Sequence, residues 1–487
     1  MLQDTNFKQL DIFQNISYHM IPENHILKRI NSQIDLSFVN DLVKDKYCAA
    51  FGRPAWNPET IARICILQML YDLSDEAIID EICVNRAAEY FCGLSPVDKR
   101  PHPTTLCKFR QLRLDDSIMD DIMAEMVRQM IEKGIIKKES GIIIDSTHIT
   151  ANTKRKVPER LMKQLAKNIF KESIKKEGLT EAEVEEAMAE KEAALPDWEK
   201  TDDHQEAKKE MKAALESVIE EADPNLESVI EAKEILNSDL FIEQKGIRSL
   251  EDKDARVGRK DTTTSFFGYK TEYIMSEEGI IMTIRTHPGN YRDGDAFIEM
   301  LGIVKGSGFA PTAAYGDKAY CRSDILNRLN RDQVDAIIPI SHAAYRIDEE
   351  LFKYNKDSDT WTCIKGNEST TGQSKVLRGE SKIRYSFDKE QCRHCPNRAQ
   401  CIGKSNRIGR VLDIGKNTLG LYEHSQFTKS KDFLERYKTR ARIEPKNAEM
   451  KRFHGLGRAR GFGLKSMRIQ AVFTAIAVNL KRMAAII

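Results

Sequence analysis

Residues 141–147 read Gly-Ile-Ile-Ile-Asp-Ser-Thr, and this stretch decides the fold class that the sequence favours. A short run of β-branched apolar residues is typical of a buried strand. The run closes on Asp145, and acids at strand ends face the crevice in which α/β sheets build their sites. The stretch therefore predicts a sheet strand that ends in a functional carboxylate.

Strand and helix signals alternate after this stretch. They are strand-like runs at Thr262–Ser276 and Gly279–Thr286, a helix near 297–304, a strand at Thr312–Tyr315 that leads into Asp317, a helix near Ser323–Leu329 and a strand at Val334–Ile340. Alternation of this kind predicts an α/β layer built on a mixed sheet.

Two insertions interrupt the alternation, and a helical segment precedes it. Residues 155–250 are charged with apolar stripes, which predicts paired amphipathic helices, whereas residues 342–430 are short, polar and loop-rich. Residues 1–135 carry helix starts such as Asn57-Pro58-Glu59, with an Asn cap and a Pro in the first turn. We therefore expect a helical domain over 1–135 and an α/β domain over 136–487 that both insertions interrupt.

The net charge of +1 hides a strong asymmetry. Lys431–Ile487 holds 14 Lys and Arg against 4 Asp and Glu, whereas Lys171–Ile235 holds 9 against 21. The basic segment predicts a surface for an anionic partner such as DNA, and the acidic segment is more simply a solvated face.

The sequence also predicts a cytoplasmic protein. Its most apolar stretch, Ala471–Leu480, is shorter than eighteen residues and has basic flanks, which favours a buried helix over a membrane span. The first residues lack a cationic region followed by an apolar one, so we expect no secretion signal. The ten cysteines are then expected to be reduced.

Three acids stand out by their positions. Asp145 and Asp317 follow strand signals, and Glu444 lies in the basic C-terminal segment. Mg²⁺ prefers carboxylate oxygens, and two such ions about 4 Å apart assist phosphodiester cleavage by activating the nucleophile and stabilising the leaving oxygen. A single Asp after a strand is more often a turn or cap residue, so it is the set of three that favours metal-dependent phosphodiester chemistry.

The strongest local pattern surrounds Glu444. Tyr437, Arg440, Glu444 and Lys451 are spaced Y-x2-R-x3-E-x6-K, and on a helix these steps place all four on one face. Arg binds phosphate through a planar fork and Lys as a point charge, so the pattern indicates a metal-binding acid flanked by phosphate-binding groups. The alternative is an ordinary helix with salt bridges.

These four residues resemble the Y-R-E-K signature of bacterial insertion-sequence transposases of the DDE type, which have a ribonuclease-H-like catalytic core. Further segments resemble the same family in the same order: Ile-Asp-Ser-Thr at 144–147, Asp-Ala-Arg at 254–256, Phe-Gly-Tyr-Lys at 267–270, Ala-Tyr-Gly-Asp-Lys-Ala-Tyr at 314–320 and Gly-Leu-Gly-Arg-Ala-Arg at 455–460. The segment from Phe51 to Arg110 resembles the helical domain that precedes the core in one branch of the family. One departure is Ser146, where many relatives carry Gly.

The resemblance implies a ribonuclease-H-like fold with Asp145, Asp317 and Glu444 as the catalytic acids, which bind two Mg²⁺ or Mn²⁺ ions. The residues implied to hold the DNA phosphates are Tyr437, Arg440 and Lys451. The implied partners are the terminal inverted repeats of a mobile element and target DNA, with a homodimer that brings two ends together. The implied reaction frees a 3′-hydroxyl at each end and joins it to target DNA. The alternatives are a metal nuclease without strand transfer and an inactive, domesticated DNA-binding protein.

The helical segment carries its own candidate DNA contacts. Lys108, Arg110 and Arg113 lie on the last of several short helices, an arrangement that resembles a helix-turn-helix domain lying against DNA. Any small helical domain gives a similar signal, so a purely structural role for these cations is the alternative.

Four cysteines occur within the second insertion, at positions 363, 392, 395 and 401. Four thiolates suit tetrahedral Zn²⁺, and a structural zinc ion would supply folding energy to a region with a poor hydrophobic core. The family resemblance supports a zinc site formed by Cys363, Cys392, Cys395 and Cys401, because relatives often have a similar cluster. His394 is an alternative ligand, and an iron–sulfur cluster or unliganded thiols are the alternative interpretations.

Overall fold

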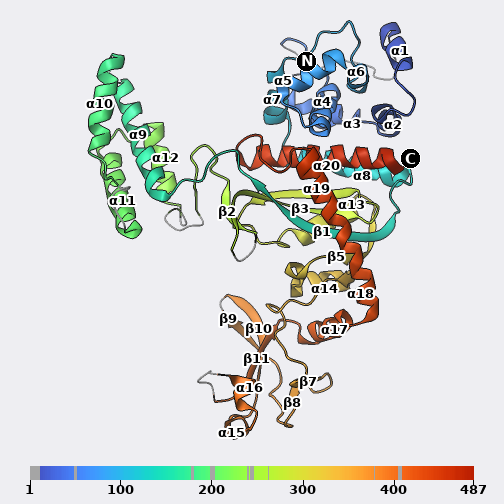
Figure 1. Cartoon of the computed structure of the whole chain (residues 1–487), viewed down its shortest axis with the longest axis vertical. Helices are drawn as coiled ribbons and strands as arrows, with labels where there is room; N and C mark the ends of the chain where they lie inside the picture. Colours follow the sequence, from blue (N-terminus) through green and yellow to red (C-terminus); the bar gives the residue numbers. More distant parts are fainter. Residues whose placement is uncertain are drawn as a thin grey trace.

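The computed structural model describes residues 11–48, 52–176, 180–197, 203–238, 241, 246–260, 263–377, 379–403 and 408–486. Figure 1 shows a central sheet with helices stacked above it, a helical unit that projects from one side and a small β unit below. Phe51 and Thr262, which belong to two of the predicted segments, lie outside the described residues. The mixed α/β architecture with a helical N-terminal region agrees with the sequence prediction.

The central sheet is mixed, as predicted. Its strands are β1 (Glu139–Thr150), β2 (Arg256–Arg259), β3 (Ser265–Ser276), β4 (Ile281–Pro288), β5 (Ala310–Tyr315) and β6 (Asp335–Ile337). The strand order is β2-β3-β1-β5-β6, and β4 also pairs with β3. Strand β3 is antiparallel to β1, β2 and β4, whereas β1, β5 and β6 run parallel. Helix α13 (Phe297–Gly306) leads from β4 to β5, and helix α14 (Ser323–Arg331) connects β5 to β6.

The N-terminal region is helical up to residue 132. Its helices are α1 (Ile12–His19), α2 (Ile26–Gln33), α3 (Phe38–Val43), α4 (Pro58–Tyr71), α5 (Asp75–Val84), α6 (Arg86–Phe91), α7 (Pro103–Arg113) and α8 (Asp116–Glu132). Helix α4 begins as predicted, because the Asn57 side chain accepts a hydrogen bond of 2.8 Å from the backbone N–H of Glu59 and Pro58 occupies the first turn.

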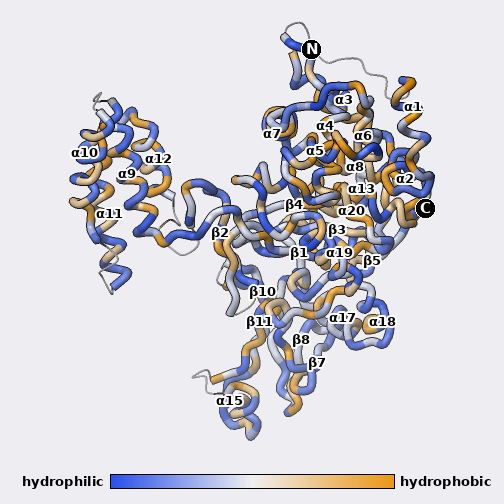
Figure 2. The backbone as a smooth tube through the Cα atoms, turned by 45° about the horizontal axis from the view of Figure 1, so that its top comes forward, coloured by the Kyte–Doolittle hydropathy of each residue, from blue (hydrophilic) through white to orange (hydrophobic). Residues whose placement is uncertain are grey.

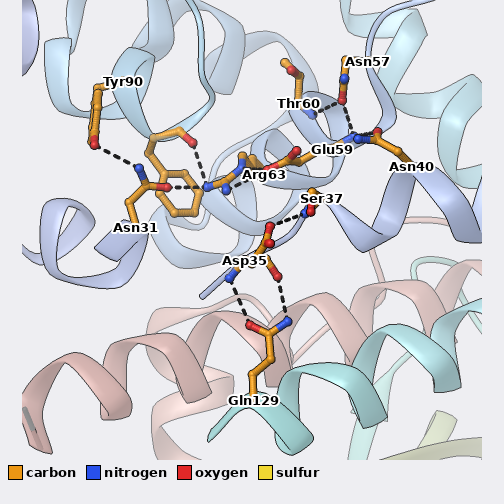
Figure 3. A network of polar contacts seen from close by, with 11 residues as sticks. Asn31, Asp35, Ser37, Asn40, Asn57, Glu59, Thr60, Arg63, Tyr90 and Gln129 are labelled. Atoms are coloured by element: carbon orange, nitrogen blue, oxygen red, sulfur yellow. Dashed lines mark hydrogen bonds and ion pairs between the residues drawn. The ribbon is translucent and has the colours of Figure 1, made fainter. Parts of the chain in front are cut away.

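A buried ion pair lies at the centre of this region (Figure 3). Glu59 and Arg63 are one helical turn apart in α4, lie 2.8 Å apart and expose only 2% and 6% of their side chains. Arg63 also donates a hydrogen bond of 2.7 Å to Asn31 of α2. Beside them, the Gln129 side chain of α8 hydrogen-bonds both backbone groups of Asp35. These contacts tie α2, α4 and α8 into one unit.

The last helix, α20 (Gly463–Ile486), joins the N-terminal helices to the sheet. It contacts α4 and β4, and a single hydrophobic core runs through all three (Figure 1). By length and composition alone α20 could cross a membrane, but 78% of its most apolar window is buried inside the protein. The predicted buried helix at Ala471–Leu480 is therefore confirmed.

The segment between β1 and β2 forms a helical unit with its own core. Its helices are α9 (Pro158–Lys176), α10 (Glu181–Ala193), α11 (His204–Glu221) and α12 (Glu227–Leu236), and they enclose side chains such as Leu161 and Met211. Figure 2 shows hydrophobic residues interspersed with hydrophilic ones along α9, α11 and α12, as predicted for amphipathic helices, whereas α10 has no buried residue. The chain leaves and rejoins the sheet at one place, because Thr150 at the end of β1 and Arg256 at the start of β2 both pair with Gly268 of β3.

The cysteine-bearing segment is a small β unit, so the prediction of a loop-rich region with a poor core is wrong. Its elements are β7 (Phe352–Asn355), β8 (Thr360–Cys363), β9 (Gln373–Leu377), β10 (Glu380–Ser386), α15 (Lys389–Arg393), α16 (Arg398–Ile402), β11 (Val411–Gly415) and α17 (Thr418–Thr428). Trp361 is fully buried and packs against Tyr354 and Tyr385. The strands are four to seven residues long and largely polar, so each gives a weak hydrophobic signal in the sequence.

Candidate active site

The register of the parallel strands brings two of the predicted acids together. Ile143 of β1 pairs with Tyr315, the last residue of β5. Asp145 and Asp317 each lie two residues further along, so they are level with each other at the carboxyl end of β5. The prediction that Asp145 closes its strand is wrong, since β1 continues to Thr150. Asp145 lies instead where β1 passes beyond the end of its parallel neighbour.

The Asp145 carboxylate is largely buried, with 16% of the side chain exposed. Burial raises its pKa to about 6, against the opposing charge of Arg440 and with a further contribution from the Asp317 carboxylate. Asp317 is partly exposed and accepts a hydrogen bond of 2.8 Å from the backbone N–H of Ala319. The two aspartates therefore form one acidic site.

The segment that carries Tyr437, Arg440, Glu444 and Lys451 is not one continuous α-helix, so that prediction is wrong. It consists of α18 (Lys431–Tyr437), a 3-10 helix (Lys438–Arg442) and α19 (Ile443–Phe453). Pro445 is the third residue of α19, and proline lacks the N–H that would continue an α-helix through the preceding turn. Arg440 therefore lies in the tighter 3-10 turn, whereas Glu444 lies in α19.

Arg440 lies between two of the three acids. Its Nη2 atom is 3.5 Å from Oδ1 of Asp145, and its Nη1 atom is 3.6 Å from Oε1 of Glu444. Glu444 exposes 70% of its side chain, whereas Arg440 exposes 19%. The guanidinium group thus connects the buried acid of the sheet to the exposed acid of α19.

Tyr437 lies among the same charged groups. Its ring stacks on Phe433, with centroids 5.5 Å apart and planes 11° apart. Burial raises the pKa of Tyr437; Arg440 opposes that effect, and the charges of the three acids, Asp145, Asp317 and Glu444, add to it. Tyr437 is therefore close enough to Arg440 and to the three acids for their charges to act on its hydroxyl.

Lysine side chains lie near Asp145 and His148. Burial lowers the pKa of Lys451 to about 8, the nearby Lys260 adds to this effect, and Asp145 opposes it. Burial, with the charges of Lys451, Lys260 and Lys270, also lowers the pKa of His148 to about 4. His148 is therefore uncharged at neutral pH, and its ring packs 5.1 Å from that of Phe266.

The sequence analysis does not identify two residues that are connected to Asp145. One contacts it directly, and the other contacts it through the first. Asn447 donates a hydrogen bond of 3.1 Å from Nδ2 to Oδ2 of Asp145. Tyr273, which pairs with Asp145 across the β1–β3 ladder, donates one of 2.9 Å from its hydroxyl to Oδ1 of Asn447. Asn447 follows Glu444 by three positions, a helical spacing that could have indicated it, but nothing in the sequence singles out Tyr273.

The acids offer the donor chemistry of a magnesium site but do not form a closed one. Among the described residues, no three His, Cys, Asp or Glu side chains lie close enough together to hold a metal ion. Asp145 and Asp317 provide the hard oxygen atoms that Mg²⁺ prefers. Glu444, the third predicted ligand, is engaged by Arg440 instead.

The four cysteines of the second insertion line one cavity. Cys363, Cys392, Cys395 and Cys401 surround it together with His394, and its volume is about 310 Å³. Burial raises the pKa of the Cys401 thiol, Arg410 opposes this effect, and the other three thiols add to it. The β unit therefore gathers all four predicted zinc ligands, although no three meet the spacing of a metal site in the described residues.

The predicted DNA contacts of the N-terminal region differ in their surroundings. Lys108 is exposed. Arg110 forms an ion pair of 2.5 Å with Asp75 and exposes 22% of its side chain. Arg113 lies over the Tyr47 ring, 4.3 Å from its centroid. Arg110 thus connects α7 to α5, and contact of these three cations with DNA stays a prediction.

Two parts of the chain match known families. Residues 16–112 match the sequence profile of a family described as Transposase domain (DUF772). Residues 362–484 match that of a family described as Transposase DDE domain, and this match includes the four cysteines and Glu444. Asp145 and Asp317 lie outside both matches. The two matches, in the order that the sequence resemblance predicts, support an insertion-sequence transposase of the DDE type.

Proposed function

We propose that this chain is a metal-dependent DNA transposase whose catalytic acids are Asp145, Asp317 and Glu444. The observation that carries the proposal is the register of β1 with β5, which sets Asp145 level with Asp317 at the place where Arg440 and Glu444 approach from the helical segment. The two family matches independently support a transposase, and of the three acids they include Glu444.

The proposed fold of residues 136–487 is ribonuclease-H-like, interrupted by the insertions 155–250 and 342–430, after a DNA-binding domain over 1–135. Three antiparallel strands, β4, β3 and β1, followed by the parallel strands β5 and β6 support this proposal.

The proposed reaction has two steps at the end of a mobile element. In the first, the oxygen of a water molecule bonds to phosphorus, the bond from phosphorus to the 3′-oxygen breaks, and that oxygen leaves as a hydroxyl. In the second, this 3′-hydroxyl attacks a phosphodiester of target DNA and expels the target's own 3′-oxygen. Two bound Mg²⁺ or Mn²⁺ ions supply activation of the attacking oxygen and stabilisation of the leaving one.

Each residue of the site has a proposed part in these steps. Asp145 and Asp317 would hold the cations at the end of β5, and Glu444 would be free to join them once a DNA phosphate bound Arg440. Tyr437 and the half-buried Lys451 bind neighbouring phosphates. Burial disfavours the charged form of Lys451, so a phosphate anion beside it would stabilise its ammonium group strongly. The partner is double-stranded DNA, bound by a homodimer that holds two element ends.

A structural zinc ion at the cysteine cavity belongs to the same proposal. The four thiols lie on β8, on α15, on α16 and in the turn between those helices. Thiolate ligation at this place would link α15 and α16 to the hairpin of β7 and β8. A domain this small gains much of its stability from such a link.

Two alternatives share parts of this evidence. A metal nuclease that does not join DNA uses the same acids, and an inactive DNA-binding protein keeps the fold without the chemistry. The assay that separates them uses linear DNA carrying both genomic flanks of this reading frame, with labelled target DNA and Mg²⁺.

The proposal expects cleavage at the inverted repeats and transfer of the new 3′-ends to target DNA, both abolished by EDTA. Asp317→Asn is expected to lose cleavage while it keeps binding to the ends. Cleavage without joining would establish the nuclease, and binding without cleavage the inactive protein. An Asp317→Asn variant that cuts normally in Mg²⁺ would overturn the assignment of the acids.

A further inference from the structure

We propose that Asn447 is a positioning residue that, together with Tyr273, orients the Asp145 carboxylate and fixes its distance from Glu444. The inference rests on the proposed function, since it concerns how one acid of the proposed site is held. It is carried by a chain of two hydrogen bonds, 2.9 Å and 3.1 Å long, that runs from Tyr273 through Asn447 to Asp145.

The first link sets the orientation of the Asn447 amide. The Tyr273 side chain is fully buried. Within the part of the chain that the structure describes, its hydroxyl bonds only to α19, to the Asn447 Oδ1 atom at 2.9 Å and to the Ile443 carbonyl at 3.5 Å. In this arrangement the Tyr273 hydroxyl donates to Oδ1 of Asn447. The Nδ2 group of Asn447 then faces Asp145.

The second link holds one oxygen of Asp145 and leaves the other for a different partner. Nδ2 of Asn447 donates to Oδ2 of Asp145, whereas Oδ1 of Asp145 faces the Arg440 guanidinium. An ionised carboxylate only accepts hydrogen bonds, so a flipped amide would place oxygen against oxygen. The Asp145 carboxylate therefore keeps Nδ2 turned towards it, the Tyr273 hydroxyl holds the opposite end of the amide, and the carboxylate is held in one orientation about its Cβ–Cγ bond.

The same chain ties α19 to the sheet. Asp145 and Tyr273 are cross-strand partners, so their side chains lie on the same face of the sheet. Asn447 and Glu444 are three positions apart in α19, so they lie on neighbouring parts of one helix face. A contact between Asn447 and Asp145 therefore sets how far Glu444 stands from the buried acid.

Hydrogen-bond partners that orient metal-binding carboxylates typically change metal affinity or activity by about 10- to 100-fold when they are removed. Asn447→Ala removes both links, and Tyr273→Phe removes only the group that fixes the amide. Glu449→Gln is the matched control. Glu449 lies in the same helix and pairs with Lys446 and Lys481, so its loss weakens α19 without altering a contact to Asp145.

The experiment measures Mn²⁺ binding to the DNA-bound protein by electron paramagnetic resonance of the free ion, beside kcat and KM for end cleavage. We expect Asn447→Ala to raise the Kd for Mn²⁺ about tenfold or more and to lower kcat, with KM for DNA unchanged and with partial rescue at high Mn²⁺. Tyr273→Phe is expected to show a smaller effect of the same kind, and Glu449→Gln to bind Mn²⁺ as the wild type does.

Wild-type Mn²⁺ affinity in Asn447→Ala, or an equal loss in Glu449→Gln, would overturn the inference while the proposed function stands. A wild-type protein that neither binds Mn²⁺ with DNA nor cleaves would overturn the proposed function itself. If Asn447→Ala does not fold, Tyr273→Phe and the isosteric Asn447→Asp provide the comparison, and wild-type Mn²⁺ affinity in both would overturn the inference.

Discussion

The Nη2 atom of Arg440 lies 3.5 Å from Oδ1 of Asp145, although 295 positions of sequence separate the two residues. The other terminal nitrogen of the same guanidinium reaches Glu444. A side-chain cation therefore stands between two acids that are proposed to bind metal cations. It follows that metal ions compete with Arg440 for these acids, whereas DNA phosphates compete with the acids for Arg440.

Arg440→Ala is expected to separate metal binding from cleavage. Without the guanidinium, the DNA-free protein should bind Mn²⁺ more tightly, because a competing positive charge is gone. Cleavage of element ends should nevertheless fall by about a hundredfold, since a phosphate-binding group is lost as well. Arg440→Lys should not restore cleavage, because a point charge does not bind a phosphate through the two parallel hydrogen bonds that a guanidinium forms. The control is Arg436→Ala, which breaks ion pairs with Asp335 and Asp432 and none with the three acids. Cleavage by Arg440→Ala at the rate of this control would contradict the prediction.

Asp145→Asn is expected to stabilise the protein at neutral pH. The folded-state pKa of Asp145 is about 6, above the ordinary value of 3.8, so the folded chain binds this proton more tightly than the unfolded chain does. Above pH 6 the buried charge lowers the free energy of unfolding by up to about 3 kcal/mol, and the penalty fades as the pH falls from 6 towards 4. The variant should therefore exceed the wild type in metal-free urea unfolding at pH 7.5, with no difference at pH 4. An Asp145→Asn variant that is less stable than the wild type at pH 7.5 would count against the burial of this charge.

Cys395→Ser is expected to release the proposed zinc ion. Freshly purified wild-type protein should contain about one zinc ion per chain by elemental analysis, and the variant should contain none and unfold at a lower temperature. Cys83→Ser serves as the control because Cys83 is exposed and far along the chain from the cavity. Wild-type protein without zinc would rule out the site, and iron in its place would indicate a cluster.

Arg63→Met is expected to lower the free energy of unfolding by about 3–5 kcal/mol, because it leaves the Glu59 carboxylate buried without its partner. Replacing both residues by Met should cost less than replacing Arg63 alone, since no uncompensated charge remains. Arg128→Ala removes exposed ion pairs with Glu125 and Glu132 and should cost less than either Met variant, because water screens exposed charges. Urea unfolding of the three variants checks the order, and equal losses in the single and double Met variants would contradict the explanation.

The sequence predicted the sheet and its acids better than the ends of its strands. The run at 142–144 is continuously apolar and was recognised as a buried strand, but β1 extends six residues past it. Beyond Asp145 the strand has lost its parallel neighbour, and its burial alternates between one face and the other. That change of pattern resembles the end of a strand in the sequence, although hydrogen bonds to β3 continue.

The helical segment shows a second limit. The spacing of Tyr437, Arg440 and Glu444 assumes α-helical steps, and the 3-10 turn before Pro445 changes them. The contacts of Arg440 with Asp145 and of Asn447 with Tyr273 depend on how this segment docks on the sheet. Spacing within one segment carries no information about residues 170 or more positions away, so these partners became visible only in the folded chain.

Both ends of the helical insertion meet the sheet beside Gly268, one on each side of β3. Neighbouring strands are about 4.8 Å apart, so the excursion of roughly a hundred residues begins and ends within about 10 Å. Because this unit begins and ends at one place and buries its own core, its folding does not depend on the strands that carry the acids. Descendants of this gene can therefore lengthen it, shrink it to a turn or exchange it for another module, and Asp145 and Asp317 would still face each other.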